Sequence, residues 1–106
     1  MVVKPPAECT GMEDIRSEID RIDRQVIALL GERAGYVHAA AAFKRSEDGV
    51  RAPERFRTML KSRRDWAEQV GLDGDMVEKL YRDLVEFFIQ KELGQFRDNG
   101  SPRDRG

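Results

Sequence analysis

The sequence predicts an all-α protein of three helices, the first much longer than the other two. Three observations lead to this prediction. Apolar residues recur at alternating steps of four and three, a spacing that places them on one face of a helix. No proline lies between Pro6 and Pro53, so nothing breaks the long first helical stretch. No segment shows the apolar–polar alternation of a β-strand.

The first helix is expected to run from about residue 12 to residue 46. Thr10, followed three residues later by Glu13, fits a capping box at its start. The apolar stripe has heptad-like spacing and consists of Ile15, Ile19, Ile22, Val26 and Leu29. At about 1.5 Å per residue such a helix is about 50 Å long, whereas a compact chain of this size has a radius of gyration of about 13 Å. The apolar overhang needs a second chain, so we expect an intertwined homodimer.

A second helix is expected over residues 53–70 and a third over residues 74–97, within a single helical domain that spans 1–106. Residues 46–50 are expected to form a loop. Pro53 suits the first turn of the second helix, and Gly71 suits its end. Asp73 or Asp75 is expected to cap the third helix. The polar tail, residues 98–106, is expected to be disordered.

Composition argues against several classes of protein. The chain has 19 Lys and Arg against 20 Asp and Glu, so it lacks the one-signed basic field of a nucleic-acid binder. No apolar run approaches a membrane span, and residues 1–7 do not resemble a signal peptide. The single cysteine, Cys9, cannot form an internal disulfide, which favours the reducing cytoplasm. With His38 as the only histidine and no glycine-rich phosphate loop, we expect no metal and no cofactor.

Two cations near the end of the first helix are the best candidates for a binding site. Arg33 takes the heptad position after Leu29, where an arginine is costly unless an anion pairs with it. Lys44 lies eleven residues further on, and eleven steps of about 100° return to nearly the same face. The interval is rich in small residues, namely Ala34, Gly35, Ala39, Ala40, Ala41 and Ala42.

This pattern has two interpretations. Either the small side chains leave room for a small anionic molecule between the two cations, or Arg33 pairs with a core carboxylate and the alanines only permit close helix packing. Arg16 points to a different face and could join Arg33 only from another chain. A site of arginine and lysine alone suits a reaction that needs binding and electrostatics rather than proton transfer.

These residues resemble the all-helical chorismate mutase family, over about residues 8–97. The resemblance is carried by Asp14-Ile15-Arg16, Ile19-Asp20-Arg21-Ile22-Asp23, Leu29-Leu30-Gly31-Glu32-Arg33 and Phe43-Lys44. Within the family the chain is most similar to the isochorismate pyruvate lyases, which make salicylate for siderophores. That similarity lies in Glu8-Cys9-Thr10-Gly11, Tyr36-Val37, Ser46-Glu47, Ala52-Pro53-Glu54-Arg55, Trp66-Ala67-Glu68 and Gly71-Leu72-Asp73. Phe56 and Phe88 stand where typical bacterial mutases have a glutamate and often a serine.

The resemblance implies a role for each of five residues toward a small dianionic substrate. Arg33 would grip one substrate carboxylate, and Arg16 of the partner chain would grip the other. Lys44 would contact the ether oxygen and a carboxylate, and Arg55 would help line the site. The last position is normally glutamine and here is Glu92, which can donate a hydrogen bond only while it is protonated.

The implied activity is a cofactor-free pericyclic conversion of isochorismate to salicylate and pyruvate, with weak chorismate mutase activity. An alternative is a mutase that acts on chorismate or an amino analogue of it. An alternative of another class is a non-catalytic helical dimer that serves as an interaction module.

Overall fold

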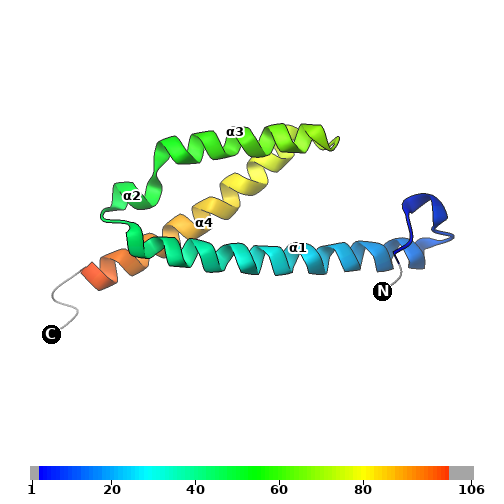
Figure 1. Ribbon diagram of the computed structural model, residues 1–106, viewed down its shortest axis with the longest axis horizontal. Coiled ribbons are helices and arrows are strands. Elements are labelled where there is room, and N and C mark those ends of the chain that lie inside the picture. The colour runs from blue at the N-terminus through cyan, green and yellow to red at the C-terminus, as the bar shows by residue number, and fades with distance from the viewer. Residues whose placement is uncertain (1–2, 101–106) are drawn as a thin grey trace. The chain divides into compact units, whose positions relative to one another are not determined.

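The computed structural model describes residues 3–100, with side chains through residue 95, and this part of the chain is helical with no strand (Figure 1). The elements are a 3-10 turn η1 (Pro6–Glu8), α1 (Met12–Ala40), a 3-10 turn η2 (Ala41–Phe43), α2 (Glu47–Arg51), α3 (Pro53–Gln69) and α4 (Gly74–Gly100). The predicted all-α class is therefore confirmed. Within the described residues, no helix is both long and apolar enough to cross a bilayer. The chain divides into two compact units, Met1–Val37 and His38–Gly106.

The first unit begins with an arm that is tied to the first turn of α1 by one carboxylate. Asp14 Oδ2 accepts hydrogen bonds from the Thr10 backbone N–H and from Thr10 Oγ1, both at 3.0 Å, and it pairs with Lys4 Nζ at 3.2 Å. The predicted Thr10–Glu13 capping box is therefore wrong. Ile15 N–H donates to the Gly11 carbonyl, so the cap falls at Gly11 and the third helical position belongs to Asp14.

Acidification is expected to release this arm. The Thr10 N–H and then Lys4 hold the pKa of Asp14 below its ordinary value of 3.8. Because the pKa of Asp14 is lowered in the folded state, its contacts stabilise the arm at pH values above the ordinary pKa. This stabilisation is lost as the pH falls through the lower pKa of the folded state. The amide resonance of Thr10, followed by NMR from about pH 6 to pH 2, should titrate with Asp14. An Asp14→Asn variant should lose this transition and Glu13→Gln should keep it. The reverse pattern would contradict the assignment.

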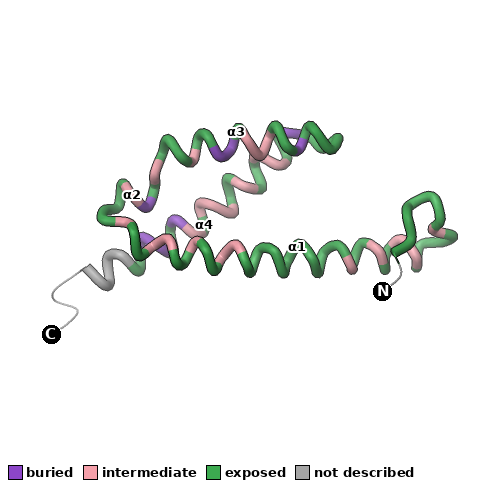
Figure 2. Tube along the Cα trace, viewed as in Figure 1, coloured by how far each residue is buried: buried purple, intermediate pink, exposed green. Residues whose placement is uncertain are grey.

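α1 carries the predicted apolar stripe on one uninterrupted helix. No residue of α1 is buried (Figure 2). The stripe is open at its centre, where Ile22 is 46% exposed, and at its end, where Leu29 is 63% exposed. Helices in water gain most of their stability by burying such a face. Among the residues of the first unit that the structure describes, none buries this apolar stripe.

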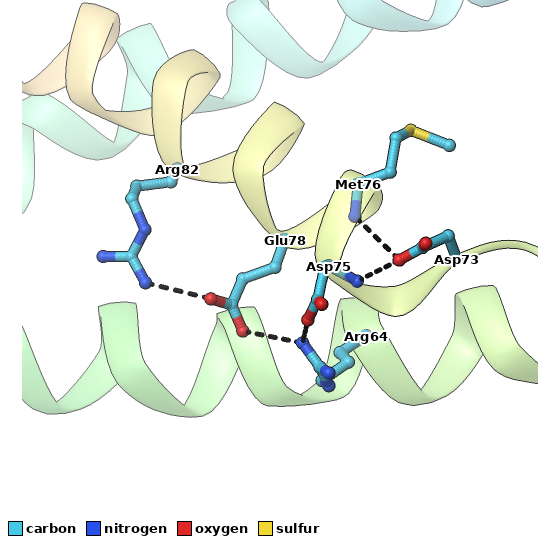
Figure 3. Close-up of polar contacts among 6 residues, drawn as sticks. All are labelled: Arg64, Asp73, Asp75, Met76, Glu78 and Arg82. Atoms are coloured by element: carbon cyan, nitrogen blue, oxygen red, sulfur yellow. Dashed lines mark hydrogen bonds and ion pairs between the residues drawn. The ribbon is translucent and has the colours of Figure 1, made fainter.

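In the second unit, α3 and α4 form an antiparallel hairpin whose turn follows the predicted signals. Gly71 has φ of +80°, a left-handed conformation that glycine adopts without strain. Leu72 N–H donates back to the Ala67 carbonyl at 2.9 Å, which closes the end of α3. Asp73 then caps α4, because its Oδ1 accepts from the backbone N–H groups of Asp75 and Met76, as Figure 3 shows. Of the two predicted caps, Asp73 is the one used.

A network of charges fastens α3 to α4 next to the turn of this hairpin (Figure 3). Arg64 Nη1 of α3 pairs with Asp75 Oδ1 at 2.6 Å and Glu78 Oε1 at 3.4 Å on α4. The other Glu78 oxygen pairs with Arg82 Nη2 at 3.2 Å. The hydrogen bond to Asp75 raises the pKa of Arg64. Gly74 lets α4 begin this close to α3, since a Cβ there would lie 2.8 Å from Arg64 Cγ.

Gly74→Ala is therefore expected to destabilise the protein by about 1 kcal/mol. Overpacking against Arg64 costs about 1–3 kcal/mol, and the better helix propensity of alanine offsets part of it. Gly94→Ala is the matched control, because nothing lies within 4 Å of its added Cβ; it should stabilise α4 by up to about 1 kcal/mol. Thermal unfolding followed by circular dichroism measures both. Equal melting temperatures for the two variants would count against the close approach.

Three predicted boundaries need correction. α1 ends at Ala40 rather than near residue 46, because the chain tightens into η2 and Lys44 is extended, with φ −94° and ψ 133°. Residues 46–50 are not a loop but mostly belong to α2, since Ser46 Oγ accepts from Gly49 N–H at 3.1 Å and caps a short helix. The predicted tail 98–106 starts too early, because α4 continues to Gly100; residues 101–106 lie outside the described part.

Candidate active site

Lys44 and Glu92, both singled out from the sequence, lie against each other in the second unit. Lys44 Nζ lies 2.6 Å from Glu92 Oε2. The Glu92 side chain is only 8% exposed, and that of Lys44 is 24% exposed. A buried carboxylate is stable as an anion only when it is paired, and Lys44 supplies the pair. Because an ammonium has three donors, Lys44 can bind Glu92 and a second acceptor together.

Glu92 is buried because it lies on the face of α4 that α2 covers. Val50 of α2 packs with Ile89 and Leu93 of α4, and Val85 adjoins this cluster. Ile89, Glu92 and Leu93 follow the i, i+3, i+4 spacing of neighbours on one helix face. The apolar cluster thus fixes the helix face from which Glu92 projects. Sequence periodicity does not single out Val50 as a site-building residue, and the only local signal is the capping serine of α2, Ser46.

The prediction that Arg33 and Lys44 lie on one face of a single helix is wrong. α1 includes Arg33 but ends at Ala40, and Lys44 follows η2 in an extended conformation. The step of about 100° per residue holds only along an α-helix, so it cannot relate the two side chains. Lys44 instead reaches Glu92 from the segment that leads into α2.

Arg16 and Arg33 both lie on α1, within the first unit, where Arg16 is exposed and Arg33 is half-buried. Their seventeen-residue separation on a continuous helix corresponds to about 25 Å along the axis and a rotation of about 100°. Side chains held so far apart cannot both grip one small dianion. If both bind the same substrate molecule, they must come from different chains.

Arg55 lies in the first turn of α3 and is exposed. In the described part of the chain, no hydrogen bond or ion pair joins it to Lys44 or Glu92. The structure therefore brings together two of the five predicted site residues within one unit. It places Arg55 on a neighbouring element of that unit and the other two arginines on α1.

Comparison with known proteins shows the family of this chain. The family model for chorismate mutase type II matches residues 15–93. The chain is 44% identical over 95 residues to a Pseudomonas aeruginosa protein named isochorismate pyruvate lyase. This alignment covers 90% of the chain and 94% of the relative. The chain is also 38% identical over 75 residues to the T-protein of Haemophilus influenzae. That alignment covers 70% of the chain but only 20% of the T-protein. The helical chain, with its lysine and glutamate in contact, belongs to the chorismate mutase type II family.

Proposed function

We propose that this protein is an isochorismate pyruvate lyase, which converts isochorismate to salicylate and pyruvate. The observation that carries the proposal is the 44% identity to the Pseudomonas aeruginosa isochorismate pyruvate lyase, which extends over 94% of that protein. The family match over residues 15–93 spans the positions of all five proposed site residues. The contact between Lys44 and the buried Glu92 supports the same function, because it holds a cation in place with donors left over for a substrate oxygen.

The active form in this proposal is an intertwined homodimer with two equivalent sites. The open apolar stripe of α1 supports it, since a second copy of the same helix can cover that stripe. The separation of Arg16 and Arg33 along α1 also supports it, because pairing two chains lets Arg16 of one reach the site of the other. Each site then uses Arg33, Lys44, Arg55 and Glu92 of one chain and Arg16 of its partner.

In the proposed reaction the enzyme holds the substrate and stabilises charge. Arg33 and the partner chain's Arg16 bind the two carboxylates and fold the enolpyruvyl arm over the ring. The ether C–O bond then breaks while the hydrogen on the adjacent, hydroxyl-bearing ring carbon passes to the enolpyruvyl methylene. Pyruvate leaves and the ring becomes aromatic as salicylate. Lys44 donates to the ether oxygen, where negative charge develops as the bond lengthens.

The family's description favours one alternative, a chorismate mutase that rearranges chorismate or an amino analogue of it. The non-catalytic dimer module is the alternative of another class. Two assays separate the three. Salicylate fluorescence that appears on adding isochorismate supports the lyase. Loss of chorismate absorbance without salicylate formation supports the mutase. If neither substrate is turned over, the result supports the non-catalytic dimer module.

Glu92→Gln is expected to keep or raise turnover at neutral pH. The substrate ether oxygen needs a hydrogen-bond donor; an amide N–H donates, whereas a carboxylate oxygen only accepts. The glutamine amide oxygen can still accept from Lys44 Nζ, which lies 2.6 Å from Glu92 Oε2 in the parent. The kcat of Glu92→Gln should therefore equal or exceed that of the parent enzyme.

Steady-state kinetics of both proteins at neutral pH test this expectation. Glu86→Gln is the matched control, because Glu86 lies on the same helix but pairs loosely with Arg51, at 3.8 Å; its kcat should match that of the parent. A Glu92→Gln enzyme that is much slower than both would show that the reaction needs the Glu92 carboxylate as an anion that orients Lys44.

A further inference from the structure

Lys44 lies near α2 and pairs with α4, and α2 in turn packs on α4. A Cβ built on Gly49 would lie 3.8 Å from Lys44 Cβ, so α2 passes close to the base of the lysine side chain. The other end of that side chain, Nζ, pairs with Glu92 of α4. Lys44 therefore lies between α2, near its base, and α4, which binds its tip.

Val50 connects α2 with α4. It follows Gly49 in α2 and is 5% exposed, packed against Ile89 (7% exposed) and Leu93 (1% exposed). These two residues flank Glu92 on the same face of α4. The one buried residue of α2 thus lies between the element that passes close to the base of Lys44 and the helix that binds its tip.

Three other contacts of α2 are weak or local. Arg51 lies 3.8 Å from Glu86, and both side chains are about half exposed, so the pair adds little. Ser46 caps α2 through Gly49 and Ala52 N–H bonds back to Asp48 at 2.7 Å, but both of these contacts lie within the segment. A five-residue helix is too short to be stable alone. The buried apolar contact of Val50 therefore helps to hold this short helix on α4.

We infer that Val50 is a positioning residue, which acts on the reaction only through Lys44. It anchors α2 on α4 and so keeps the ammonium group where it meets Glu92 and the substrate. The inference rests on the function proposed above for the kinetic part of its test. It assigns Val50 no contact with the substrate.

Val50→Ala is expected to lower kcat by about 10-fold, since small misplacement of a catalytic group costs up to about 100-fold, and to change KM much less. The decisive comparison is with the Lys44→Ala background. A positioning residue has nothing left to position there, so Val50→Ala should change the residual kcat less than twofold. A merely structural role would lower kcat by the same factor in both backgrounds, which would overturn the inference.

Val77→Ala is the matched control, because it removes the same atoms from a half-buried valine about 18 Å along α4 from Ile89. It should leave kcat within twofold of the parent. Circular dichroism checks that each variant is folded. If Val50→Ala does not fold, Val50→Thr replaces it, since threonine keeps the shape and weakens the apolar contact.

Limited trypsin digestion tests the anchoring without any substrate. Cleavage after Lys44 and Arg45, mapped by mass spectrometry, should be about 10-fold faster in Val50→Ala than in Val77→Ala, because proteolysis follows the population of the opened segment. Equal cleavage rates would overturn the inference. If the parent turns over neither isochorismate nor chorismate, the proposed function fails, and the digestion still decides whether Val50 anchors the segment.

Discussion

Lys44→Ala is expected to lower kcat for isochorismate by about 100- to 1,000-fold, the usual loss when one preorganised donor to a developing negative charge is removed. The ether oxygen gains charge only as its bond breaks, so Lys44 contributes far more to the transition state than to substrate binding. KM should therefore change much less than kcat. Steady-state kinetics from salicylate fluorescence measure both constants.

Lys79→Ala is the matched control for the loss of a lysine. Its ammonium is exposed on the same helix as Glu92 and pairs with Asp83 at 2.9 Å, so kcat should stay within twofold of the parent. A Lys44→Ala enzyme within a few-fold of the parent would remove the electrostatic mechanism proposed here.

Mixing two inactive variants should restore activity. Arg16→Ala and Arg33→Ala are each expected to abolish most turnover, because each removes the grip on one substrate carboxylate. In a mixed dimer one site receives Arg33 from one chain and Arg16 from the other, and is fully native. With random subunit exchange half of the dimers are mixed and half of their sites are native, so about one quarter of parental activity should return.

A mixture of Arg33→Ala and Lys44→Ala is the control for this rescue. Both residues are proposed to serve the site of their own chain, so in that mixture every site lacks one of them and no activity should return. Native mass spectrometry verifies that subunits exchange. A folded monomer at micromolar concentration, or no recovery from the first mixture once exchange is verified, would contradict the shared site.

Periodicity and capping residues predicted the parts of this fold that depend on local sequence. The apolar stripe predicted α1, while Gly71 and Asp73 marked the turn between α3 and α4. The α2 segment was missed because its stability comes from Val50 packing on α4, which no local pattern records. Gly74 was missed for the same reason, since its need for a small side chain comes from Arg64 of another helix.

The site was predicted unevenly. Helical geometry was extended past the end of α1 and wrongly placed Lys44 on the face of Arg33. The pairing of Lys44 with Glu92 joins residues from different elements, so it could be anticipated only from the resemblance to a family and not from spacing. Arg16 was predicted to serve the site of a partner chain because seventeen helical residues separate it from Arg33, and this stays a prediction.

The most direct test of the proposed function is the turnover of isochorismate by the purified protein in buffer that contains a metal chelator and no added cofactor. Salicylate is followed by fluorescence, and pyruvate is measured in the same sample. We expect equimolar salicylate and pyruvate at an initial rate proportional to enzyme concentration, with about 100-fold or greater loss for Lys44→Ala. Salicylate formation no faster than in enzyme-free buffer, or equal rates for the parent and Lys44→Ala, would contradict the proposal.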